Sequence, residues 1–552
     1  MIGRAVTWRC ALLVGGALTP LVALPPGPVV ELPPMIVNET IGSAHWLYTE
    51  VHGDEYLSRC PPKLTLEFIA KRERAWQRLH ALVPDEFLAH LSSITILADA
   101  AVAPKAGDMV AQDVLRPTPL KTPGRAVAVH YLPNLRIDDR DQAGFFSYLD
   151  DTELAQMELA ITAYYLRSLL ERRTPMLPPW LTAGLLVLRS QISPNETGVT
   201  LRPFLWMSPE ESRALLRDPA RPRALLPAGE MFAPDALRGA ENSQPRRVLT
   251  LRAQVGLFAR WALDPRNGAR AAFWKFARLA SEQRVTEELF AQCFGFGFSD
   301  LRDRLNDYLP LAIKDPLRLA EDPAPQFAAP ELLDATPLAI ARLRGTWERL
   351  EISYVRRTHP EFVESYIIQA RRTLREPYER GEKNAWLLAE LGLCEFDAGD
   401  LAAGQPLLDD ALAAGAPRPQ AAYALARLRF AQLRRDQPPD RFFSAAEIAP
   451  IVEPLRIAVQ LAPPLPEVFS LLADAWLQTR GPIPPADLVA LARGGKLFAM
   501  DPVVSYRIAL VLVRAGRRAE AGELLETGIE YATDDPMRAR FAQLRSALAP
   551  AP

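Results

Sequence analysis

The stretch Pro178-Pro179-Trp180-Leu181-Thr182-Ala183-Gly184-Leu185 decides how the middle of this chain folds. Proline lacks a backbone N–H and its ring clashes with the preceding helical turn, so two consecutive prolines end a helix that reaches them. Pro175, three residues earlier, breaks the chain as well. The sequence therefore predicts a break over these prolines, followed by a helix that carries Trp180 and the apolar run Leu185 to Leu188.

A helix-rich region surrounds this stretch. Apolar residues spaced three and four apart predict a helix from Thr152 to Arg172, with Thr152 as its N-cap. The same pattern predicts later helices at 249–263, at 271–282, from Glu287, and at 301–309. Residues 193–247 contain many Pro and Arg residues, so we expect them to form loops.

The preceding region is predicted as a layer of strands and helices. Thr65 is a candidate cap for a helix whose apolar residues recur every three or four positions up to Val83. Residues 93–97 and 126–131 are β-branched or alternate in polarity, which indicates strands. The segment 104–124 between them is expected to form a loop.

The composition and the N-terminus limit the class of protein. The 552 residues carry a net charge of −2, which gives no reason to expect a nucleic-acid or anionic-membrane partner. Residues 1–24 have the basic start and short apolar core of a secretory signal, with a buried N-terminal helix as the alternative. Residues 25–34 would then be a Pro-rich spacer. This signal predicts an exported protein, periplasmic or secreted, with association with the cell envelope as a further option. No later stretch reaches the length of a transmembrane span, so we expect the mature chain to be soluble.

The C-terminal part shows a repeated helical pattern after a Pro-rich linker at 313–338. Its spacing matches a tetratricopeptide repeat, a helix–turn–helix unit of about 34 residues. The matching positions are Leu391, Gly392, Gly399, Asp400, Gly404, Leu408 and Ala411, and Ile508 to Leu525 follow the same spacing. Small residues such as Gly392 let paired helices approach closely. We therefore expect tetratricopeptide-like repeats at 339–548, with an ordinary helical bundle as the alternative.

The opening stretch also resembles part of an enzyme family. In zinc metallopeptidases of the gluzincin type, a Pro-Pro-Trp-Leu-x-Glu-Gly segment follows the His-Glu-x-x-His helix, and its Glu is the third protein ligand of zinc. This chain has Ala183 at that position. The best-spaced register places Met157 and Ile161 at the two His positions and Glu158 at the general base. A second register, over Thr152–Gln156, is worse spaced and equally lacks ligands.

The resemblance implies a fold and argues against the activity. The chain is similar to secreted bacterial proteins that join a gluzincin-like domain, here 35–312, to tetratricopeptide repeats. It implies an α+β peptidase-like domain followed by an all-α repeat domain, mostly α-helical overall. The histidines are at positions 45, 52, 80, 90, 130 and 359, so the predicted helical core has none. Because zinc prefers imidazole and thiolate ligands, we expect no metal, no cofactor and no zinc-dependent hydrolysis.

Other candidate sites carry weaker signals. Asp138-Asp139-Arg140-Asp141 clusters three carboxylates, which could seat Ca²⁺ or Mg²⁺, but a solvated loop with one internal Arg pair is the favoured interpretation. Gly295-Phe296-Gly297 is expected to turn the chain rather than hold a phosphate. Cys60, Cys293 and Cys394 are widely spaced, so buried free thiols are favoured over a disulfide.

These patterns together predict a non-catalytic exported protein. Its vestigial site would comprise Met157, Glu158, Ile161 and Ala183, and its repeats would bind a protein or peptide as a scaffold in the cell envelope. Two alternatives remain open. One is a hydrolase of another type that uses Glu158 with further carboxylates, and the other is a purely structural part of an envelope assembly.

Overall fold

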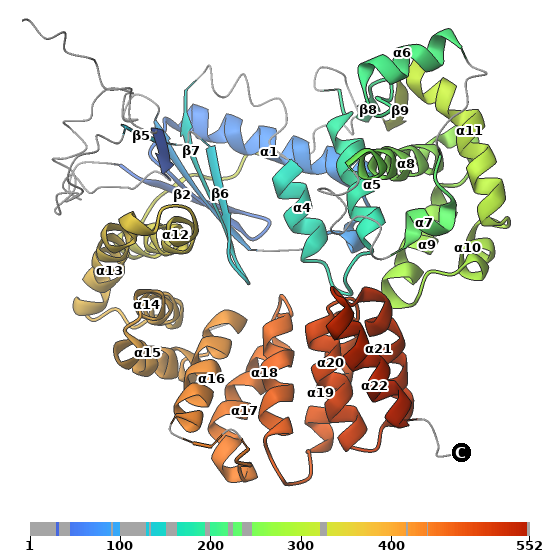
Figure 1. Cartoon of the computed structure of the whole chain (residues 1–552). Coiled ribbons are helices and arrows are strands. Elements are labelled where there is room, and N and C mark those ends of the chain that lie inside the picture. The colour runs from blue at the N-terminus through green and yellow to red at the C-terminus, as the bar shows by residue number, and fades with distance from the viewer. Residues whose placement is uncertain are drawn as a thin grey trace, which may run out of the picture.

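The structure is a computed structural model of the whole chain. It describes residues 29–32, 45–89, 92–99, 128–131, 134–150, 163–193, 199–218, 225–233, 245–320, 328–415, 418–435, 437–438 and 440–548. The described residues are mostly α-helical, with a small mixed sheet on the N-terminal side and a helical C-terminal region (Figure 1). The expected signal at 1–24 and the positions Met157, Glu158 and Ile161 lie outside them.

The main sheet has six strands in the order β10-β2-β3-β4-β7-β6. They are β2 (Leu47–Val51), β3 (Asp54–Ser58), β4 (Ser93–Asp99), β6 (Asn134–Asp138), β7 (Ala143–Leu149) and β10 (Leu333–Asp334). The inner strands β3, β4 and β7 are parallel, and β2, β6 and β10 pair antiparallel. The strand expected at 93–97 is therefore confirmed as β4.

The described residues also form two shorter sheets, and the one of β8 and β9 lies near the helices α6 (Pro209–Arg217) and α11 (Phe298–Lys314), away from the main sheet (Figure 1). β1 (Val29–Leu32) pairs in parallel with β5 (Ala128–Tyr131), and β8 (Val199–Leu201) pairs antiparallel with β9 (Leu317–Ala320). The expected Pro-rich spacer thus contains β1, and the expected linker at 313–338 contains β9 and β10. Proline is tolerated beside short edge strands, which is why a Pro-rich composition did not separate these segments from the fold.

One helix covers each face of the main sheet. On one face, Phe68 of α1 (Pro62–Leu82) packs in a cluster with Tyr56 of β3. On the other face, Trp347 of α12 (Pro337–Thr358) packs in a cluster with Phe146 of β7. An apolar sheet face needs such a cover. The first helix of the region expected as repeats therefore completes the core of the N-terminal sheet.

Thr65 does not cap α1 as expected. The helix begins at Pro62, because proline is accommodated in the first turn of a helix, where its missing N–H costs nothing. Thr65 is fully buried one turn later, and its hydroxyl lies 2.7 Å from that of Ser58. The rest of the expected helix is confirmed.

The helical half that follows the sheet forms the largest apolar core. Its helices are α4 (Ala163–Glu171), α5 (Pro179–Ser190), α6 (Pro209–Arg217), α7 (Ala228–Phe232), α8 (Pro245–Leu263), α9 (Arg270–Glu282), α10 (Glu287–Phe294) and α11 (Phe298–Lys314). The four helices expected between 249 and 309 are confirmed. The loop expected at 193–247 is wrong in part, because Ser208 caps α6 and Met231 of α7 is buried in the core.

The opening stretch of sequence lies at the centre of this core. Pro179 begins α5, and Trp180 packs among four Phe rings, stacked on one of them, with centroids 5.1–6.2 Å from its own. Gly184 allows α5 to cross α8 closely, since a Cβ there would lie 3.0 Å from the carbonyl oxygen of Val255. The prolines, the Trp and the Gly of this stretch thus all serve packing.

The C-terminal helices form an arc. They are α12, α13 (Val363–Glu379), α14 (Ala385–Ala398), α15 (Leu401–Ala413), α16 (Pro419–Arg434), α17 (Ala445–Gln460), α18 (Pro466–Leu477), α19 (Pro485–Leu497), α20 (Pro502–Arg514), α21 (Arg518–Tyr531) and α22 (Asp535–Leu548). Successive helices pack in pairs, and α12, α14, α16, α18 and α20 also contact one another in series. We call these five the inner helices.

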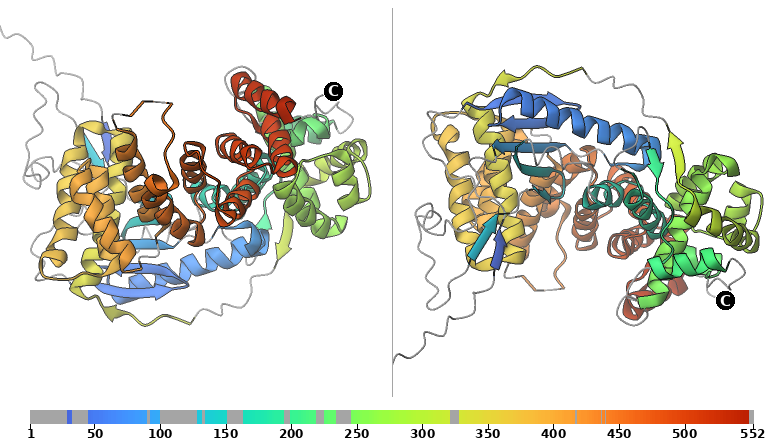
Figure 2. Two further views of the ribbon diagram at one scale, coloured as in Figure 1. Left: turned by 90° about the horizontal axis from the view of Figure 1, so that it is seen from below. Right: turned by 90° about the horizontal axis from the view of Figure 1, so that it is seen from above.

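The N-terminal half spans the two ends of the arc (Figures 1 and 2). At one end α12 packs on the sheet. At the other end the backbone N–H of Met176 donates to the carbonyl of Leu497, 3.1 Å away, and Arg284 pairs with Glu530. The arc and the N-terminal half therefore close on each other.

Replacing Gly404 of α15 by Ala should lower the free energy of unfolding by about 1–3 kcal/mol, because overpacking forces neighbours apart. A Cβ there would lie 2.7 Å from the ring of Phe396 and 3.0 Å from the carbonyl oxygen of Gly392. Gly522 of α21 is the matched control, since a Cβ there meets nothing within 4 Å. Gly522→Ala should stabilise by up to about 1 kcal/mol. Urea unfolding of both variants checks this, and equal effects would contradict close packing of α14 on α15.

Candidate functional site

A pocket lies along α5, at the stretch that resembles a zinc-peptidase segment. Ala183 of α5 lines a cavity of about 670 Å³ between α4 and α5. The other residues around it are Arg167, Glu171, Met176, Leu177, Pro179, Thr182, Leu186, Val187, Ser190 and Arg252. Most of this lining is apolar, and charge is confined to the two α4 residues and Arg252. The pocket is thus a largely apolar recess with a polar margin.

The charged groups of α4 reflect a partly desolvated margin. Glu171 pairs with Arg167 across one helical turn, with 3.9 Å between Oε1 and Nε. The pKa of Glu171 is nevertheless raised, because burial disfavours its charged form more than Arg167 and Arg172 favour it. Burial likewise lowers the pKa of Arg189 on α5. The side chains of Arg167 and Glu171 are still 57% and 60% exposed, so this margin of the pocket remains open to water.

The described residues at this pocket do not fit a zinc ion. A methyl group stands at 183, and no group of three or more His, Cys, Asp or Glu side chains within the described ranges is placed to hold a metal. Met157, Glu158 and Ile161 cannot be placed relative to Ala183, because they lie outside those ranges. No step of a reaction through a metal follows from this arrangement.

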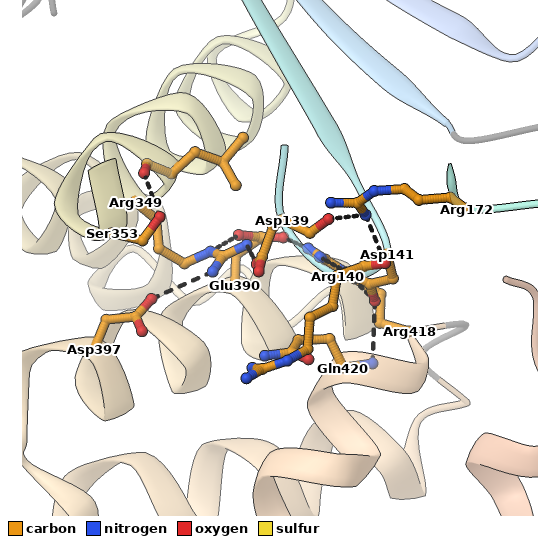
Figure 3. A network of polar contacts seen from close by, with 11 residues as sticks. Asp139, Arg140, Asp141, Arg172, Arg349, Ser353, Glu390, Asp397, Arg418 and Gln420 are labelled. Atoms are coloured by element: carbon orange, nitrogen blue, oxygen red, sulfur yellow. Dashed lines mark hydrogen bonds and ion pairs between the residues drawn. The ribbon is translucent and has the colours of Figure 1, made fainter. Parts of the chain in front are cut away.

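A second polar site lies at the turn between β6 and β7, where it meets the inner helices (Figure 3). Asp141 is almost fully buried, and its carboxylate accepts from Nε of Arg418 at 3.2 Å and from the backbone N–H of Gln420 at 3.1 Å. Asp139 accepts from Nη2 of Arg349 on α12 at 3.0 Å. The two carboxylates of the turn are thus held by two arginines of the arc.

The two arginines also pair with carboxylates of α14, and one of these, Glu390, pairs with both. Nε of Arg349 lies 2.8 Å from Glu390, its Nη1 lies 3.3 Å from Asp397, and Arg418 also pairs with Glu390. Burial would raise the pKa of Asp139, but Arg349 and Arg418 outweigh burial and hold that pKa below its usual value. Burial raises the pKa of Asp397. Asp139 therefore stays charged, and its charge stabilises the contact between the turn and α12.

The remaining polar groups of the turn are bound as well. Nε of Arg140 lies 2.9 Å from Glu467 at the start of α18, and its guanidinium stacks 5.4 Å above the ring of Tyr423. Arg172, which follows α4, donates to the carbonyl of Arg140 at 2.8 Å and to that of Asp139. The side chains of Asp139, Arg140 and Asp141, and the carbonyls of Asp139 and Arg140, therefore all have partners outside the turn.

The expectation of a solvated loop at Asp138–Asp141 is therefore wrong. Asp138 pairs locally with Arg136, 3.0 Å away. The partners of Asp139 and Asp141 come from α12 and the start of α16, more than 200 residues away in sequence, so no local pattern reveals them. Arginines take up the carboxylates that the Ca²⁺ or Mg²⁺ interpretation needed. In the sequence, only the clustering of three acids around one Arg, directly after a strand, indicated a polar site here.

The other sequence expectations can be placed directly. Cys60 and Cys394 are buried, Cys293 is half-buried, and all three are free thiols, as expected. Gly295 ends α10 at a φ of +78° and turns the chain, as expected. None of the described helices has the length and apolar character needed to cross a membrane.

The fold and these two sites define a mostly helical protein whose C-terminal arc closes around a sheet-containing N-terminal half. No protein-family model and no curated protein matches the sequence.

Two buried carboxyl groups on α12 stand apart from the network of the turn. Glu351 is fully buried, and one of its oxygens accepts from the indole N–H of Trp347 at 2.8 Å. Burial, and then the neighbouring Glu348, raise the pKa of Glu351 well above its usual value. Glu348 is equally buried but pairs with Arg344 and accepts from Gln369. The two carboxyl groups are thus equally buried, but Glu348 has an arginine partner, whereas Glu351 has only the hydrogen bond from Trp347 among the contacts described.

Glu351→Gln should raise the free energy of unfolding at about pH 7.5 by about 1–2 kcal/mol, because it removes an uncompensated buried acid. An acid whose pKa is raised by folding costs stability increasingly as pH climbs above its usual value of about 4.3. The gain should therefore shrink at about pH 5. Glu348→Gln, which loses an ion pair, should destabilise. Urea unfolding at both pH values tests this, and similar losses for both variants would refute it.

Proposed function

We propose that this chain is a non-catalytic exported protein in which a peptidase-like domain and tetratricopeptide-like repeats bind a protein or peptide of the cell envelope. The pocket at Ala183 carries the proposal. A recess persists where the resemblance places a peptidase site, while the residue at the ligand position is a methyl group. Binding without hydrolysis is what such a site supports.

The pocket suits an apolar side chain presented by a peptide. A volume of about 670 Å³ falls within the usual range for sites that bind small groups, and Leu177, Leu186 and Val187 supply an apolar lining. Arg167 and Glu171 at the margin supply hydrogen-bonding groups for a peptide backbone. Desolvation of the apolar side chain would provide most of the affinity.

A phage-displayed library of random peptides, selected on the full chain, is the direct test. The enriched peptides should share an apolar anchor residue and should remain uncleaved. Ala183→Trp places an indole ring in the pocket and should weaken peptide binding by about tenfold or more, which corresponds to about 1.4 kcal/mol. Ala402→Trp, at an exposed position of α15, is the matched control and should leave binding unchanged. Cleavage of the peptides, or equal binding by both variants, would refute the proposal.

A further inference from the structure

The arc holds the β6–β7 turn as a receptor holds a peptide. Asp139 pairs with Arg349 of α12, and Asp141 pairs with Arg418 at the start of α16 (Figure 3). Between them in sequence, Arg140 pairs with Glu467 of α18. The contacts come from three different inner helices. Together these helices therefore select a segment in which an acidic, a basic and an acidic residue follow one another. Charge order along a short segment is the usual basis of specificity in polar recognition.

The helices need an acidic occupant at this place. Arg349 and Arg418 are almost fully buried, with side chains 3% and 2% exposed. If the turn left, Glu390 would still pair with both guanidinium groups, but Arg349 would lose Asp139 and Arg418 would lose its bidentate partner Asp141. Losing one of its partners is unfavourable for a buried charge. An occupant with carboxylates two residues apart would restore both pairs.

The N-terminus of α16 adds a geometric requirement. Its N-cap residue, Arg418, makes no capping hydrogen bond with its own side chain. Asp141 supplies the cap instead, by accepting from the backbone N–H of Gln420. An anion at a helix N-terminus is favoured by the helix dipole as well as by the free N–H groups. The second acid of an occupant is therefore fixed in position.

The recognition surface continues beyond the turn. A pocket of about 380 Å³ lies along α16, α18 and α20, next to the contact between Arg140 and Glu467. Tyr423, Ser470 and Arg507 are among its lining residues. Arg140 of the turn contacts Glu467 and Tyr423 at the edge of this pocket, but no residue of the turn lines it, so a longer segment would gain contacts that the turn lacks.

We propose that this surface of α12, α14, α16 and α18 recognises an acidic Asp-x-Asp segment of a partner protein, and that the chain's own turn occupies it in the free state. An acidic segment of this kind would be the partner of the binding protein proposed above, and the proposal rests on that function. The tethered turn has a high effective concentration, so a partner must outcompete it. Weakening the turn should therefore open the site to an external segment.

The test uses the full chain and a fluorescein-labelled peptide with the sequence of residues 136–143. Fluorescence polarisation should show that the double variant Asp139→Asn/Asp141→Asn binds this peptide at least about tenfold more tightly than the wild type does. A peptide with Asn at both Asp positions should not bind. Equal, weak binding of both peptides by a folded double variant would overturn the inference.

Two further variants keep the test decisive. Arg140→Ala removes the contact with Glu467 without leaving a buried acid, so it should fold and should increase peptide binding by a smaller factor. Binding no tighter than that of the wild type would overturn the inference even if the double variant failed to fold. Ala183→Trp should leave binding of the acidic peptide unchanged, whereas it should weaken binding of the phage-selected peptides by about tenfold or more if the proposed function holds. The two proposals can thus fail separately.

Discussion

Arg418→Ala is expected to lower the free energy of unfolding by about 3–5 kcal/mol, the cost of breaking a buried ion pair by removing one partner. The reason is that Asp141 and Glu390, both almost fully buried, would lose a shared guanidinium group. The free energy of unfolding of Arg418→Lys should lie between those of the wild type and Arg418→Ala, because a lysine keeps the charge but cannot bind Asp141 with two parallel hydrogen bonds. Urea unfolding followed by circular dichroism measures all three proteins.

Arg538→Ala is the matched control for this experiment. Arg538 pairs with Asp535 on α22, where the side chains are 44% and 94% exposed, so its loss should cost less than about 1 kcal/mol. If Arg418→Ala lowers the free energy of unfolding as little as Arg538→Ala does, the contact between the β6–β7 turn and the inner helices does not stabilise the fold. The wild type should also lose stability as pH falls below about 3.9, since the pKa of Asp139 is lowered by folding.

The triple variant Met157→His/Ile161→His/Ala183→Glu is expected to bind about one zinc ion per chain, at least about a hundredfold more tightly than the wild type. The resemblance places these three positions around one point, with Glu158 retained as the former base. Inductively coupled plasma mass spectrometry after dialysis against zinc gives the stoichiometry, and competition with a chelating dye gives the affinity.

The second register supplies the control for the triple variant. Thr152→His/Gln156→His/Ala183→Glu adds the same ligands but spaces them less well from position 183. It should bind zinc no better than the wild type does. Equal zinc binding by both triple variants, or by neither, would contradict the proposed register of the peptidase-like helix.

The helices were predictable from the sequence because their signals are local. Apolar spacing located α8 to α11, and the prolines before Trp180 located the start of α5. The ends were less predictable where a residue fits two roles: Thr65 resembles a cap but is buried against Ser58. Short helices such as α6 escaped detection because Pro and Arg residues dominate the composition around them.

The candidate sites were only partly predictable. The sequence pointed to Ala183, and the structure finds a pocket there. The contacts of Asp139 and Asp141 could not be predicted, because the distance in sequence to Arg349 and Arg418 leaves no periodic signal. The packing of α12 on the sheet was missed for the same reason, since its apolar residues fit a repeat helix equally well.

The most direct test of the central claim is a paired measurement on the purified wild-type chain. The chain is dialysed against zinc, its metal content is determined, and it is incubated with casein and with the phage-selected peptides. We predict no stoichiometric zinc and no cleavage, together with binding of the peptides that Ala183→Trp weakens. Stoichiometric zinc with zinc-dependent cleavage would contradict the claim that this is a binding protein built on a peptidase-like fold.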